Sequence, residues 1–194
     1  MAIENNAAQM AGDTLTGDLW VFGYGSLMWR PGFDWAERRM ARLEGWRRSF
    51  CLRSIHYRGT PEAPGLVLGL DRAPGVACDG VAYRVASDAR AAVLAYLRAR
   101  ELVSYAYHER TAALRLEGGA AAEAEAVIYV VDRAHPQYAG VLSLAEQAAI
   151  IARSAGPMGA NRDYLLQTVE HLAALGVSDP ELEALAARVR ALGD

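Results

Sequence analysis

The chain has 194 residues, of which 53% are hydrophobic and 22% charged, a composition typical of a globular protein that buries one core. Its formal net charge of -3 excludes the basic footprint of a nucleic-acid-binding protein. We therefore expect a single domain over residues 18–194 and no nucleic-acid partner.

The first 17 residues, MAIENNAAQMAGDTLTG, lack the cationic start and apolar run of a secretory signal. No later segment approaches the ~20 apolar residues of a membrane span. We expect a flexible tail over residues 1–17, a cytoplasmic location and no membrane partner. Cys51 and Cys78 have neither CxxC spacing nor a neighbouring histidine, so we predict two buried, reduced thiols and no zinc site.

Strand-forming residues dominate the first two thirds of the chain. Segments rich in Val, Ile, Leu, Tyr or Trp, each bounded by Gly, Pro or Asp, predict strands near residues 19–24, 41–53, 65–70, 79–85, 107–116 and 124–132. One helix interrupts them. It is predicted to begin after an N-cap at Ser87 or Asp88 and to end near residues 103–104, because Val93, Leu94 and Leu97 form an apolar face.

The last third changes to helical periodicity. A capping box from Ser143 to Glu146, a helix that closes on Gly176 and a proline at position 180, suited to a first helical turn, predict three helices. Strands followed by helices indicate an α+β protein with a mixed or mostly antiparallel sheet that curls around its own core.

The first predicted strand ends in an unusual way. WVF, at residues 20–22, is followed by GYGSL at residues 23–27, although glycine is depleted in strands. Gly23 and Gly25 permit positive φ and close approach of the main chain to a ligand, so the N-H groups of Tyr24, Ser26 and Leu27 are candidates for holding a carboxylate. A plain tight turn is the alternative. The stretch is not a phosphate-binding loop, because it lacks the third glycine and the lysine.

Glu101 is the second unusual residue. It follows Leu97 by four positions and Leu94 by seven, which places its carboxylate on the apolar face of the predicted helix. Burial and the negative end of the helix dipole both raise the pKa of a glutamate there, as a general base near neutral pH requires. An ion pair with Arg98 or a solvated helix end is the alternative. Tyr105 and Tyr107 follow, either as site residues or as core residues.

Other catalytic chemistries find little support. The four histidines, at 56, 108, 135 and 171, show no metal-ligand spacing, and Ser26 does not lie in a GxSxG motif. The arginines near residues 38, 47 and 72 are predicted to form a solvated surface, with one of them a candidate to reach a ligand carboxylate.

Four blocks in order, VFGYGSLMW, GVAYRV at 80–85, YLRARE at 96–101 and AGPMGANRDYL at 155–165, resemble the ChaC-like γ-glutamylcyclotransferases from about Leu19 to the C-terminal helix. The resemblance implies a small mixed β-barrel of about six strands with flanking helices. It also implies that Glu101 is the catalytic base. The family's substrate-binding loop falls on residues 21–27, which are Val21, Phe22, Gly23, Tyr24, Gly25, Ser26 and Leu27.

The implied reaction is the cleavage of glutathione into 5-oxoproline and Cys-Gly, with no metal or organic cofactor. Other γ-glutamyl amino acids or amines are alternative substrates, and a non-catalytic binding domain of the same fold is the alternative from another class. Glu101 discriminates between an enzyme and a binding domain, since a binding domain has no need of an acid on an apolar helix face. The oligomeric state is not fixed by the sequence, and a monomer is favoured. Two departures from the family are LVSYAY at 102–107, where familiar eukaryotic members carry a glycine pair before a tyrosine, and Met158, where serine is common.

Overall fold

The structure, a computed structural model, describes residues 11–120 and 122–193. Two compact units divide the chain. The first reaches Arg48 and resumes from Leu70 to Asp132, and the second comprises Ser49–Gly69 and Arg133–Asp194. The strands β2 and β3 run through both units, so the single domain expected from the sequence stays a prediction.

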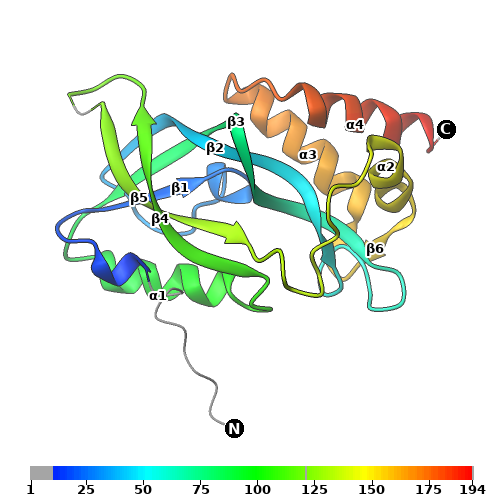
Figure 1. Cartoon of the computed structure of the whole chain (residues 1–194), viewed down its shortest axis with the longest axis horizontal. Coiled ribbons are helices and arrows are strands. Elements are labelled where there is room, and N and C mark those ends of the chain that lie inside the picture. The colour runs from blue at the N-terminus through cyan, green and yellow to red at the C-terminus, as the bar shows by residue number, and fades with distance from the viewer. Residues whose placement is uncertain (1–10, 121, 194) are drawn as a thin grey trace, which may run out of the picture. The chain divides into compact units, whose positions relative to one another are not determined.

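Five strands close into a barrel in the order β1-β3-β2-β4-β5 (Figure 1). Their bounds are Leu19–Gly23 for β1, Glu37–Ser54 for β2, Gly65–Val85 for β3, Tyr107–Leu116 for β4 and Glu123–Val131 for β5. The barrel is mixed, because β1 is antiparallel to β3 and parallel to β5. The α+β class and the mixed barrel predicted above are confirmed.

The barrel has one strand fewer than predicted, because the segments 65–70 and 79–85 belong to a single strand, β3. The sequence between them contains Pro74 and Gly75, which usually end a strand. Here Gly75 adopts a φ of 80° in a solvent-exposed stretch. A glycine with positive φ can absorb a bulge without ending the strand.

An apolar cluster in the first unit joins the barrel to the helix α1, Arg90–Glu101. Val93, Leu94 and Leu97 form the buried face of α1, as their spacing predicted. They pack against barrel residues, among them Val127 and Tyr129 of β5, and against Leu27 from the loop after β1. Each fully buried residue of this kind contributes roughly 1.5–3 kcal/mol, so the cluster fixes the position of α1 on the barrel.

Both ends of α1 differ from the prediction by a few residues. The N-cap is Ala89, with no side-chain cap, whereas Ser87 or Asp88 was expected. The N-H of Ser87 is instead bound by the carboxylate of Asp18, at 3.2 Å. The helix ends at Glu101, and the chain then turns through Tyr105, whose φ is 56°.

The segment just before β1 is held against the barrel. Residues Ala11–Thr14 form a short 3-10 helix, η2, in which Gly12 is buried. The N-H of Gly12 donates to Glu109 at 2.9 Å, and Arg90 donates to the Gly12 carbonyl oxygen at 2.6 Å. A buried carboxylate thus binds this segment at Gly12, while the flexible tail over residues 1–17 stays a prediction; residues 1–10 lie outside the described residues.

The second unit holds the predicted C-terminal helices, α2 (Leu144–Arg153), α3 (Asn161–Ala174) and α4 (Pro180–Ala191). The capping box from Ser143 to Glu146 is present, Pro180 opens α4, and Gly176 follows α3 with a φ of 73°. A two-stranded sheet, β6 (Ala155–Gly156) with β7 (Gly159–Ala160), precedes α3. None of the described helices is long and apolar enough to cross a membrane.

Candidate active site

Of the glycine loop, residues 21–27, the first three residues still belong to β1, and the others leave the barrel and tighten into a 3-10 turn, η3, at Ser26–Met28. The N-H of Met28 donates to the carbonyl oxygen of Gly25, and the N-H of Arg30 donates to that of Ser26, both at 2.8 Å. Tyr24 and Leu27 are buried. The loop is therefore packed into the core, and its N-H groups at the start of the turn lack intrahelical acceptors.

The two glycines do not have the backbone conformation that the sequence suggested. Gly25 has a φ of -133°, and Gly23 is also outside the positive-φ region. The constraint on Gly23 is space, since a Cβ there would lie 3.0 Å from Cβ of Leu27 and 3.1 Å from the backbone nitrogen of Met28. The expectation of positive φ is thus wrong. The close contact that excludes a side chain at Gly23 is with residues of the following turn, Leu27 and Met28.

Arg48 binds the backbone of the glycine loop. Its guanidinium donates to the carbonyl oxygen of Tyr24 at 2.7 Å and also to that of Asp79. The hydroxyl of Tyr83 donates to the carbonyl oxygen of Met28 at 2.7 Å. Because Arg39 and Arg48 are both buried, the prediction of a solvated surface for the arginines near residues 38 and 47 is wrong for these two.

Glu101 is the last residue of α1, whereas the helix was predicted to continue to residues 103–104, and its side chain keeps 19% of its surface exposed. Burial raises the pKa of the Glu101 carboxyl, and the positive charge of Arg100 opposes that rise. Arg98 does not pair with Glu101; its side chain binds Glu109 and Asp13. The alternative of an ion pair with Arg98 is therefore excluded, and the cation beside Glu101 is Arg100, at 3.2 Å.

Arg100 also contacts the glycine loop. Its Nη2 donates to the hydroxyl oxygen of Ser26 at 2.9 Å, while its Nε lies 3.2 Å from Glu101 Oε1. One side chain thus connects the loop to the candidate base, although Ser26 and Arg100 are 74 positions apart. Sequence reasoning missed Arg100, and its position directly before Glu101 was the available signal.

A second acidic residue, Glu109 of β4, is completely buried. Arg98 binds both of its oxygens, at 2.8 and 2.9 Å, and the Tyr129 hydroxyl donates to it at 3.1 Å. Burial raises the pKa of Tyr129, and the negative charges of Glu109 and Glu101 raise it further. Glu109 was also missed, although it is the only acidic residue in the predicted strand 107–116.

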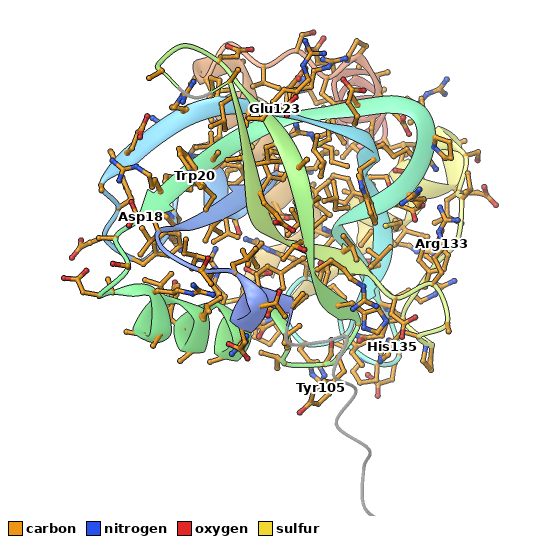
Figure 2. All side chains as sticks on the ribbon, turned by 60° about the vertical axis from the view of Figure 1, so that its left-hand side comes forward. Asp18, Trp20, Tyr105, Glu123, Arg133 and His135 are labelled. Atoms are coloured by element: carbon orange, nitrogen blue, oxygen red, sulfur yellow. The ribbon has the colours of Figure 1, made fainter. Side chains whose placement is uncertain are left out.

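The two tyrosines beyond Glu101 diverge. Tyr107 packs against the apolar cluster, whereas Tyr105, labelled in Figure 2, lies on the loop between α1 and β4 with 63% of its surface exposed.

His108 lies 3.4 Å from Asp132. Within residues 11–120 and 122–193, no group of three or more His, Cys, Asp or Glu side chains is arranged to hold a metal ion.

The mixed barrel is a known fold. A crystal structure of a γ-glutamyl cyclotransferase specific to glutathione from yeast superimposes with a TM-score of 0.81, over 91% of this chain and 100% of that one. The two sequences are 24% identical, so this likeness shows the fold.

Sequence comparison defines the family. The ChaC-like protein family matches residues 19–192. A glutathione-specific γ-glutamylcyclotransferase of Escherichia coli is 36% identical over 96% of this chain and 79% of its own length, and γ-glutamylcyclotransferase 2-3 of Arabidopsis thaliana is 36% identical over 89% and 88%. A human glutathione-specific γ-glutamylcyclotransferase 1 is 32% identical over 90% and 78%. The chain belongs to the ChaC-like family.

Proposed function

We propose that this protein is a γ-glutamylcyclotransferase that cleaves glutathione into 5-oxoproline and Cys-Gly. Family membership supports the reaction class, and relatives named as glutathione-specific support the substrate. The observation that carries the assignment of the site is the reach of Arg100, which contacts the glycine loop at Ser26 and the carboxylate of Glu101.

In the proposed reaction the α-amine of the substrate attacks its own γ-carbonyl carbon. A new C-N bond closes the five-membered ring, and the bond between the γ-carbon and the cysteine nitrogen breaks. Because both reacting groups belong to one molecule, the protein has to fold the γ-glutamyl chain into the reactive geometry and move protons. The reaction as proposed uses no metal or organic cofactor.

Glu101 acts as the general base in this proposal. It takes a proton from the α-ammonium group and later gives a proton to the departing amine. A carboxylate whose pKa is raised by burial is suited to this task, because a base works best when its pKa is close to the working pH. The backbone N-H groups of residues 24–27 bind the negative charge that develops on the γ-carbonyl oxygen.

We place the protein in the cytoplasm. Cys51 and Cys78 are both buried and form no disulfide, which fits a reducing compartment. A monomer remains our expectation for the oligomeric state.

Release of 5-oxoproline from a panel of peptides tests the proposal. Glutathione is expected to react faster than γ-Glu-Ala, and α-linked Glu-Cys-Gly is expected not to react, because its first peptide bond offers no five-membered closure. Equal rates on glutathione and γ-Glu-Ala would remove the glutathione assignment and leave the broader class. No 5-oxoproline from any γ-glutamyl peptide would overturn the proposed function.

A further inference from the structure

The guanidinium of Arg100 contacts five groups in and around the candidate site. Besides Ser26 and Glu101, its guanidinium donates to the carbonyl oxygens of Arg30 and Pro31, at 2.8 and 3.1 Å, and to the hydroxyl of Tyr96, at 3.0 Å. Its side chain is 22% exposed. The three nitrogens thus face three parts of the chain: the glycine loop, the turn that follows it, and the end of α1.

The contacts of the guanidinium indicate whether Arg100 holds the site together or binds the substrate. An arginine has five N-H donors in a rigid fork. Nη1 is shared among three acceptors, Nη2 is bound to Ser26, and Nε faces the Glu101 carboxylate. Because all three nitrogens are already engaged, Arg100 is better suited to hold the site together than to bind a substrate carboxylate directly.

We propose that Arg100 is the positioning residue of the site: it fixes the distance between the glycine loop and the Glu101 carboxylate, and its adjacent positive charge favours the ionised form of that carboxylate. This inference rests on the proposed function. The planar fork matters, because one lysine ammonium is a compact charge and cannot reproduce contacts that diverge in three directions.

The other charged and titratable groups around Glu101 do not replace Arg100. On β5, Tyr129 is a neutral hydroxyl that donates to Glu109 of β4. On α1, Arg98 is occupied by Glu109 and by Asp13 of η2. Burial raises the pKa of Glu101 and the charge of Arg100 opposes this rise, so removing that charge should raise the pKa of Glu101 further.

Two variants separate the two roles. Arg100→Met removes both the charge and the planar guanidinium. In the pH profile of kcat/KM for glutathione, the low-pH limb is expected to move to higher pH by about one unit. The plateau of that profile is expected to fall by about 10²-fold, because the base is displaced. Arg100→Lys is expected to return the limb close to its wild-type position while the plateau rate stays reduced. Arg42→Met, which removes an exposed arginine paired with Asp79, is the matched control and should leave both quantities unchanged.

Each outcome is decisive. An unmoved limb in a folded Arg100→Met protein overturns the electrostatic role, and full wild-type turnover in Arg100→Lys overturns the positioning role. If Arg100→Met does not fold, Arg100→Lys still decides, since a lowered plateau with a wild-type limb supports the proposal and a full plateau contradicts it. Absence of 5-oxoproline release by the wild-type protein would overturn the proposed function and this inference together, whereas an active wild type with unaffected variants overturns this inference alone.

Discussion

Glu101 and Glu109 are both withdrawn from water, but their surroundings suit them to different tasks. Glu109 accepts hydrogen bonds from Arg98, Tyr129 and the N-H of Gly12, and an acid this fully bound is a structural anchor whose loss leaves buried partners unsatisfied. Glu101 has one cation beside it and part of its surface exposed. A carboxylate with few partners and a raised pKa is the better candidate for accepting a substrate proton.

The titration of Glu101 predicts a pH-dependent effect of Glu101→Gln on stability. Because the pKa of Glu101 is raised in the folded protein, the folded state holds its proton to higher pH than the unfolded state does, and this contribution to stability is lost as the pH rises through the folded-state pKa. Glutamine does not titrate. The thermal midpoint of the variant, relative to wild type, should therefore increase between pH 4 and pH 8. A difference that is constant with pH would contradict the raised pKa.

At the scale of elements, the turn from β1 into η3 depends on the missing side chain of Gly23. The backbone of Gly23 lies so close to Leu27 and Met28 that a Cβ added at Gly23 would be about as near to them as packed atoms allow. Leu27 in turn packs in the same cluster as Leu97, one turn before Glu101. Displacing the turn should therefore disturb the base as well as the loop.

Gly23→Ala tests this packing. Overpacking of this kind costs about 1–3 kcal/mol, so the thermal midpoint should fall by several degrees and KM for glutathione should rise. Ser26→Ala is the comparison, because it removes only the hydroxyl that binds Arg100 and should leave the midpoint within about 2 °C of wild type. A Gly23→Ala protein with wild-type midpoint and KM would show that the close approach at Gly23 is dispensable.

The elements were largely predictable because local rules decide them. The capping box at Ser143, Pro180 at the start of α4 and the apolar spacing of α1 are all as the sequence predicted. The prediction was wrong at Pro74 and Gly75, where the strand β3 continues through residues that usually end strands. Tertiary pairing, which no local rule contains, decides that case.

For the whole molecule, the sequence indicated which segments belong to the candidate site but not how they meet. Gly23 and Glu101 stood out from their neighbours by their residue type, whereas the contact of Arg100 with Ser26 joins positions far apart in the chain. Glu109 was missed for the same reason, since its partners Gly12 and Arg98 come from two other elements. All of these residues lie in the first compact unit, so one unit contains the candidate base, the loop and their supports.

The rate of 5-oxoproline release from glutathione by Glu101→Gln is the most direct test of the central claim, that Glu101 is the base of a γ-glutamylcyclotransferase. Glutamine keeps the size and shape of the side chain but cannot accept the proton, and general-base catalysis contributes about 10² to 10⁴ in rate. If Glu101 is the base, turnover should fall by that order with the fold intact and with glutathione binding little changed. A folded variant that keeps more than about a tenth of wild-type turnover would contradict it.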